Sequence, residues 1–237
     1  MNIKMGILKT YFLVYLFLFA QVGVSHAQEP SVLMKEIQDR LEKINDYEAD
    51  ARMKTEITFL KVPDAGVKIY YKKPDKIKIK NQNGISLVPK ETMSISLYSL
   101  VKSPYQALDA GIDRIQGIPV RVIKLLPSDE NADLVLATLY IDISRLLILK
   151  AKITTRENGT DEVELFYGKF LPFGLPDKII FSFNTENFKL PKGVTFDYDD
   201  GSVKKKVVET GKSQRGKIEI TYLNYTLNKG LADSLFK

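Results

Sequence analysis

From Tyr47 onward, apolar and polar side chains alternate along the chain, and this two-residue period constrains the fold more than any other feature of the sequence. The run from Tyr47 to Phe59 is the longest. Similar runs follow at spacings of about 8–12 residues, separated by turns rich in Pro, Asn, Asp and Gly. Successive strand side chains point to opposite faces, so each run predicts a strand with one buried face. The pattern predicts about ten strands in one large antiparallel sheet or open barrel.

Two segments predict helices instead. Apolar residues recur at helical spacing between Ser31 and Asp46, with charged residues on the other side and Ser31 as the expected N-cap. The segment 103–112 predicts a second, short helix. Beyond 47–59, we expect strands at 67–71, 77–80, 85–88, 94–98, 119–126, 133–143, 147–156, 162–167, 177–184, 204–209 and 217–226.

The N-terminus has the pattern of a cleavable signal peptide. Lys4 and Lys9 precede ten apolar residues, 11–20, and Ser25-His26-Ala27 is a small-x-small cleavage site. Ten residues are too few to span a bilayer, which takes roughly 20 in a helix. We therefore expect residues 1–27 to be removed and the mature chain, 28–237, to work outside the cytoplasm. An uncleaved N-terminal anchor remains the alternative.

The residues that the mature chain lacks restrict its chemistry. There is no Cys, and the single histidine, His26, lies within the predicted signal peptide. Disulfides, Cys or His nucleophilic catalysis and the usual zinc and copper ligands are thereby excluded. The acidic residues near Asp200-Gly201 lack the spacing of a calcium loop and predict a hairpin turn instead. We expect no enzyme activity, no metal and no cofactor. The alternative that stays open is catalysis by a pair of carboxylates that only folding brings together. The net charge of +6 is dispersed, without an Arg-rich tract, and predicts no nucleic-acid binding.

Several segments resemble the bacterial periplasmic carriers of outer-membrane lipoproteins and their lipoprotein-sorting relatives, the LolA-like family. Residues 69–80, IYYKKPDKIKIK, resemble that family's hairpin, in which a strand ends in a basic residue plus Pro. Residues 139–160, 173–176 and 190–196 resemble later parts of its layout. The resemblance implies a mainly β (α+β) fold: a curved antiparallel sheet forms an incomplete barrel closed by one or more helices, with a cavity for acyl chains.

The sequence also departs from that family's pattern. Lys73 stands where the carriers usually have an arginine that fastens the lid helices, and lysine cannot make the forked contact of a guanidinium. Asn83-Gly84 follows where the family has Asp-Gly-Lys. Residues 28–237 are expected as a single half-barrel domain, in which 197–237 form a C-terminal extension beyond the family's usual end.

A half-open barrel that holds lipid needs inward-facing apolar side chains rather than catalytic groups. The resemblance and the alternation together give lipid-binding candidates and a cavity rim. The lipid-binding candidates are Met53, Ile57, Ile69, Tyr71, Ile77, Ile79, Leu97, Val122, Leu139 and Ile141, and the rim candidates are Lys72 and Lys73. The alternative, that these residues pack a closed core, stays open because alternation is the same in filled and hollow barrels.

Two functional hypotheses follow. The first is a monomeric periplasmic carrier or chaperone that binds the acyl chains of lipoproteins or lipids and transfers them towards the outer membrane. It would meet envelope proteins at the inner and outer membranes. The second is a structural or sensing module of the envelope that uses the same fold as a protein-binding surface. A cavity filled by the protein's own side chains would favour the second.

Overall fold

The computed structural model describes residues 29–57, 60–61, 63–81, 97–185 and 215–236. Within these residues, twelve strands form one antiparallel sheet, and the mostly β fold expected from the alternation is confirmed. The strands are β1 (Asp46–Ile57), β2 (Leu60–Lys61), β3 (Ala65–Lys72), β4 (Lys76–Asn81), β5 (Tyr105–Ile115), β6 (Ile118–Pro127), β7 (Leu134–Asp142), β8 (Leu147–Thr155), β9 (Gly159–Phe166), β10 (Lys178–Asn184), β11 (Arg215–Tyr222) and β12 (Thr226–Leu227).

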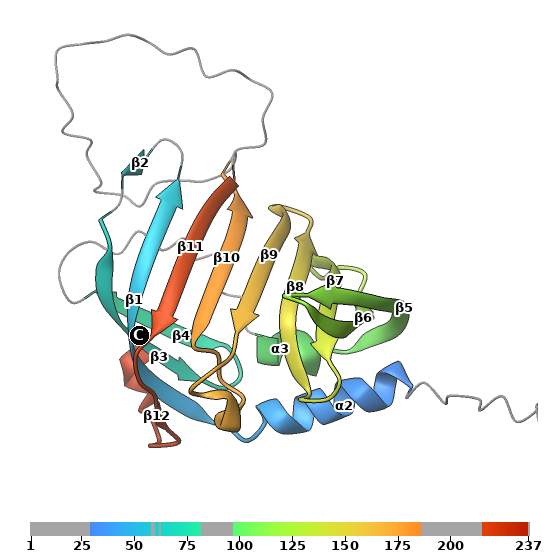
Figure 1. The fold of residues 1–237 in the computed structure, drawn as a ribbon, viewed down its shortest axis with the longest axis horizontal. Helices are drawn as coiled ribbons and strands as arrows, with labels where there is room; N and C mark the ends of the chain where they lie inside the picture. Colours follow the sequence, from blue (N-terminus) through green and yellow to red (C-terminus); the bar gives the residue numbers. More distant parts are fainter. Residues whose placement is uncertain (1–28, 58–59, 62, 82–96, 186–214, 237) are drawn as a thin grey trace, which may run out of the picture.

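The sheet is curved and open. Ten strands follow the order β4-β3-β1-β11-β10-β9-β8-β7-β6-β5, while β2 and β12 pair with β1 beside this path. β4 and β5 are its two ends, and no pairing joins them within the described residues, so the barrel is incomplete. Figure 1 shows β4 and helix α3 (Leu97–Lys102) behind the central strands, and helix α2 (Pro30–Leu41) along the lower edge.

Helix α2 confirms the expected N-terminal helix but is shorter at its C-terminus. It ends at Leu41 rather than near Asp46, and its buried face is Leu33, Met34 and Ile37. Ser31 is not the N-cap: Glu29 occupies that position without a side-chain cap, and Pro30 begins the helix. A proline at the first helical position needs no N–H partner and already has a helical φ, which explains the earlier start.

The region between β4 and β6 corrects two predictions. The helix expected at 103–112 is wrong, because Tyr105–Ile115 forms β5, paired along β6 with a bulge between Asp109 and Ile112. The strand expected at 94–98 is wrong at Leu97 and Tyr98, which begin helix α3. Gly111 at the bulge has φ +91°, a left-handed value that a helix would not contain. The strands expected at 85–88 and 204–209, residues 94–96 and the turn at Asp200-Gly201 lie outside the described residues.

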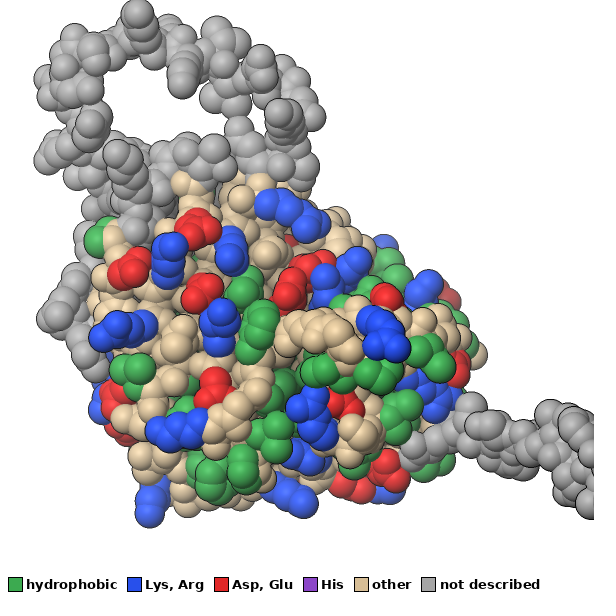
Figure 2. Space-filling model, viewed as in Figure 1, with side chains coloured by type: hydrophobic (Ala, Val, Ile, Leu, Met, Phe, Trp, Pro, Cys, Tyr) green, Lys and Arg blue, Asp and Glu red, His purple; other side chains and the backbone are tan. Residues whose placement is uncertain are grey.

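Two large apolar clusters divide the inner face of the sheet. One lies where α2 and α3 cover β6, β7 and β8, and it includes Leu33, Val101, Ile123 and Leu139. The other lies on β1, β3 and β11, around Met53, Val67, Ile69, Ile218 and Ile220. Figure 2 shows the opposite face of the central strands, where lysines and arginines are interspersed with acidic residues. The strands therefore have one apolar and one charged face, as their alternation predicts.

Residues after β11 are fastened to the sheet by polar contacts. The Asp46 carboxylate accepts hydrogen bonds from the backbone N–H groups of Lys229 and Gly230, at 2.9 and 3.0 Å. The Lys72 ammonium donates to the Leu231 carbonyl and to Asp233, both at 2.7 Å. β11 itself lies between β1 and β10. The part of the expected extension that the structure describes is thus built into the centre of the fold.

Candidate functional site

A cavity of about 210 Å³ opens on the inner face of the sheet. Its wall comes from β3 and β4 on one side, from β8 to β11 on the other, and from α2, α3 and the loop after β9. Most of the lining is apolar, contributed by isoleucine, leucine, valine and phenylalanine side chains. This volume is smaller than the roughly 300–1,000 Å³ of typical ligand pockets. The inner face is therefore not completely filled by the protein's own side chains.

The structure brings together four of the ten lipid-binding candidates at this cavity. Ile69 and Tyr71 reach it from β3, Ile77 from β4 and Leu97 from α3. These residues lie on three different elements, and the pairing of Ile77 with Tyr71 places two of them side by side. Whether they contact lipid stays a prediction.

The other six candidates do not line the cavity. Met53 and Ile57 are buried in the β1–β3–β11 cluster, and Ile79 packs against it. Leu139 and Ile141 are fully buried beneath the helices. Val122 pairs with Tyr140, while the inward-facing residues of β6 that join the helix-covered cluster are Ile123 and Leu125. Since neighbours along a strand point to opposite faces, Val122 faces away from the cavity, which corrects its expected inward orientation.

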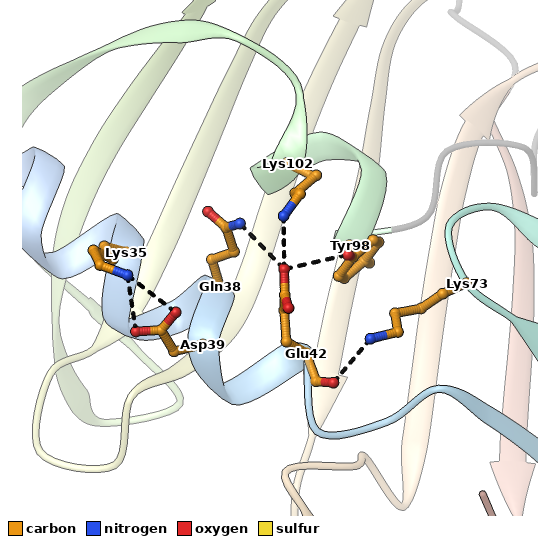
Figure 3. A network of polar contacts seen from close by, with 7 residues as sticks. All are labelled: Lys35, Gln38, Asp39, Glu42, Lys73, Tyr98 and Lys102. Atoms are coloured by element: carbon orange, nitrogen blue, oxygen red, sulfur yellow. Dashed lines mark hydrogen bonds and ion pairs between the residues drawn. The ribbon is translucent and has the colours of Figure 1, made fainter.

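The rim candidates fasten the edge of the cavity without lining it. Figure 3 shows Lys73 in the turn between β3 and β4, where its ammonium donates to the Glu42 carbonyl at 2.9 Å. The same ammonium lies 5.3 Å from the centre of the Tyr98 ring. Lys72, as described above, holds the C-terminal segment. Lys73 therefore links the turn to both helices, the position in which the resemblance implies a lid contact.

The Glu42 side chain extends this link. Its Oε1 accepts hydrogen bonds from the Lys102 ammonium at 2.7 Å and from the Tyr98 hydroxyl and the Gln38 amide, both at 3.4 Å (Figure 3). The hydrogen bond from Lys102 is the main reason that the pKa of the Glu42 carboxyl lies below its ordinary value. The Lys35–Asp39 pair in the same view stays on the α2 surface. One carboxylate thus joins α2 to α3 beside the cavity.

Aromatic rings form one end of the cavity. The Tyr225 ring stacks on Tyr222, with centroids 4.8 Å apart, and meets Phe170 and Tyr47 edge-on at 4.8 and 5.2 Å. The Tyr225 hydroxyl donates to the Pro176 carbonyl at 2.9 Å. Burial raises the pKa of Tyr222 to about 12 and that of Tyr225 further. These hydroxyls stay protonated at physiological pH and serve as hydrogen-bonding groups in an apolar wall.

Arg40 lies at the same end. Its guanidinium donates to the Arg145 and Leu171 carbonyls at 3.0 and 3.2 Å, which ties α2 to two loops. The Arg40 Nε is buried without a hydrogen-bond partner among the described residues. Gly174 lies directly over it: a Cβ there would be 2.8 Å from Nε, and the φ of Gly174 is +71°. A glycine is therefore required where this loop crosses the arginine.

At the other end, a carboxyl lines the cavity. Asp161, near the start of β9, pairs with Ile153 of β8 and is followed along the same face by Val163 and Leu165. Burial raises the pKa of Asp161 to about 6, although a hydrogen bond from the Asn184 backbone and the charge of Arg215 partly oppose the rise. From Asp161 to Tyr167, the residue directly after β9, the chain advances by six residue-to-residue steps, or roughly 20 Å.

Sequence reasoning missed most of the wall that β9, β10, β11 and the C-terminal segment supply. Alternation in these strands marked their apolar faces, and Ile218, Ile220, Tyr222 and Tyr225 were visible as an apolar series. No local pattern indicated that β11 would lie between β1 and β10, because strand order is a tertiary property. Arg40 and Asp161 carried no signal, because single charged residues in amphipathic elements usually face solvent.

Similar folds occur among solved structures. A candidate outer membrane lipoprotein-sorting protein domain from Vibrio parahaemolyticus aligns with a TM-score of 0.53 at 10% identity, covering 88% of this chain and 97% of that one. A LolA superfamily protein from Nitrosomonas europaea aligns with a TM-score of 0.53 at 11% identity, covering 86% and 97%. No protein-family model matches the sequence, and no curated protein sequence matches it. The chain has the fold of lipoprotein-sorting, LolA-like proteins, as the sequence resemblance implies.

Two further features bear on the site. Among the described residues, no cluster of His, Cys, Asp and Glu is arranged to hold a metal ion. In the same part of the chain, no helix has the length and apolar character that crossing a membrane takes.

Proposed function

We propose that the protein is a periplasmic carrier that binds the acyl chains of lipoproteins or lipids in this cavity and moves them towards the outer membrane. The observation that carries the proposal is the unfilled, mainly apolar cavity on the inner face of the sheet. Burying each methylene of a bound chain there contributes about 0.8 kcal/mol. The N-terminal pattern of a signal peptide and the lipoprotein-sorting fold support the location and the cargo class.

The length of one cavity wall supports a single hydrocarbon chain. The lining residues from Asp161 on β9 to Tyr167, directly after β9, extend over roughly 20 Å. One leaflet of a bilayer is roughly 15 Å of hydrocarbon, half of the 30 Å core. An acyl chain of membrane length therefore has a wall long enough to cover it. The network of Lys73, Glu42, Tyr98 and Lys102 lies beside the cavity, where separating the helices from the β3–β4 turn would widen access.

Two neighbouring residues on β10 provide a matched test. Ile179 lines the cavity, whereas Ile180 lies on the opposite face and pairs with Glu164 and Glu219. Both side chains are partly buried. Ile179→Asn and Ile180→Asn make the same chemical change on the same strand. Only Ile179→Asn puts an amide without a hydrogen-bond partner against the bound chain, at a cost of about 1–3 kcal/mol.

The measurement is native mass spectrometry, with lipid extraction, on the protein purified from a bacterial periplasm. We expect acyl-bearing species to copurify with the wild type and with Ile180→Asn, and to be depleted in Ile179→Asn. Equal lipid loading of the two variants would contradict binding in this cavity. A wild type that carries no lipid, even after incubation with lipoprotein and phospholipid, would favour the envelope protein-binding module.

A further inference from the structure

We propose that the cavity selects amphiphiles that carry a cationic amine, with Asp161 as the group that binds the amine. This inference rests on the proposed binding of hydrocarbon chains and adds a polar specificity to it. Lipids and acylated peptides both include molecules with a free amine, so the shared chemistry is a long hydrocarbon chain bearing an ammonium group.

The position of Asp161 is the first observation. Among the described residues that line the cavity, it is the only acidic side chain. Its strand neighbours on the inner face are Ile153, by direct pairing, and Val163, two residues along β9. A carboxylate among aliphatic side chains loses hydration, and a bound cation is the partner that best compensates for this loss.

The groups that already act on Asp161 leave room for such a partner. The Asn184 backbone N–H donates one hydrogen bond to the carboxylate, and Arg215 acts on it as a charge. Arg215 is exposed at the first residue of β11, so solvent screens its charge. Two carboxylate oxygens offer about four acceptor positions, more than one N–H donor satisfies. Burial accordingly outweighs both partners and raises the pKa of Asp161 to about 6.

The surroundings on the same end of the sheet are also polar. Three buried threonines lie near the ends of their strands there: Thr55 on β1, Thr155 on β8 and Thr185 just after β10. Thr55 pairs with Ile218, which lines the cavity. The opposite end carries Arg40, a cation, and the tyrosines. Among the residues that the structure describes, the two ends therefore differ in charge, and an ammonium group is attracted to the Asp161 end and repelled from the Arg40 end.

Three amphiphiles of one chain length separate charge from hydrocarbon binding: dodecylamine, dodecanol and dodecanoic acid. Each displaces a neutral fluorescent acyl probe, at pH 7.5 and below its micellar concentration. We expect the wild type to bind the amine roughly tenfold more tightly than the alcohol, as for one charge-assisted hydrogen bond. The fatty acid should bind more weakly than the amine, because it has no ammonium group for Asp161 to bind and its carboxylate has the same sign as Asp161.

Two variants decide the role of Asp161. Asp161→Asn keeps an oxygen for the Asn184 N–H and removes the charge, so the preference for the amine should disappear while the alcohol binds as before. Glu162→Gln changes the next residue of β9, which points to the opposite face of the sheet and forms an ion pair with Lys150. This variant should keep the preference for the amine. If Asp161→Asn does not fold, the wild type at pH 5 makes the same comparison, because protonation removes the charge and should weaken the preference.

Equal affinity of the wild type for all three molecules would overturn the amine site and leave hydrocarbon binding intact. Persistence of the amine preference in Asp161→Asn would also overturn it. If none of the three molecules displaces the probe, the proposed hydrocarbon binding in the cavity is refuted, and the amine site is refuted with it.

Discussion

Replacing Tyr225 by alanine tests whether the C-terminal segment completes the cavity wall. The Tyr225 ring contacts three others, at centroid distances of 4.8, 4.8 and 5.2 Å. Truncation of a large buried aromatic residue to alanine costs about 3–5 kcal/mol, and three aromatic pairs at about 0.5–1.5 kcal/mol each account for much of this. We expect Tyr225→Ala to lower the free energy of unfolding by about 3–5 kcal/mol, measured by urea denaturation followed by circular dichroism.

Tyr225→Phe is the matched control, because it keeps the ring and loses only the hydroxyl, which donates to the Pro176 carbonyl and is hydrogen-bonded with Tyr222. Its expected cost is about 1 kcal/mol. Removal of the ring also enlarges one end of the cavity, so Tyr225→Ala should shift binding towards longer fatty alcohols, while Tyr225→Phe keeps the wild-type optimum. A loss below 1 kcal/mol in Tyr225→Ala, or an unchanged optimum in chain length, would refute a structural and length-setting role for this ring.

Three further substitutions test other parts of the argument. Leu139→Ala should lower the free energy of unfolding by about 2–5 kcal/mol in urea denaturation without abolishing lipid copurification, because Leu139 is fully buried away from the cavity; loss of lipid in a folded variant would contradict this. Gly174→Ala should lower the melting temperature, because the new Cβ would lie 2.8 Å from the Arg40 Nε at a φ of +71°; an unchanged melting temperature would show that the loop can move. Asp161→Asn should raise the free energy of unfolding at pH 7 by about 1–2 kcal/mol and leave it unchanged below pH 4.

The strands and their faces followed from the sequence because a two-residue period is a local signal. β6, β7, β8 and β10 lie within two residues of their expected positions. Local signals failed at 103–112, where a helix was expected and β5 begins, because pairing with β6 decides the conformation of a segment with little periodicity of its own. Its largely exposed edge position removed the apolar alternation that identified the other strands.

The cavity could be predicted only in part, because it depends on which strands the curved sheet brings opposite each other. Ile69 and Ile77 were found from the hairpin that resembles the lipoprotein carriers. Leu139 has the same alternating pattern, yet α2 and α3 cover it and fill the space above it. Period-two alternation marks an inner face but carries no information on what packs against that face. The difference between a core residue and a cavity residue is therefore tertiary.

The pH dependence of the free energy of unfolding provides a second test of Asp161, without a ligand. A carboxyl whose pKa rises on folding, here from 3.8 to about 6, binds more protons in the folded state between these values. The free energy of unfolding then falls as pH rises through this interval, and the loss is complete above it. The full difference corresponds to at most roughly 3 kcal/mol, which solvent screening at a partly exposed site reduces to about 1–2 kcal/mol.

Asparagine at this position avoids this loss of stability and keeps an oxygen that accepts the hydrogen bond from the Asn184 backbone N–H. A cation bound next to Asp161 would restore the stability that burial of the carboxylate removes. Addition of dodecylamine at pH 7 should therefore raise the melting temperature of the wild type more than that of Asp161→Asn, and equal increases would refute this account.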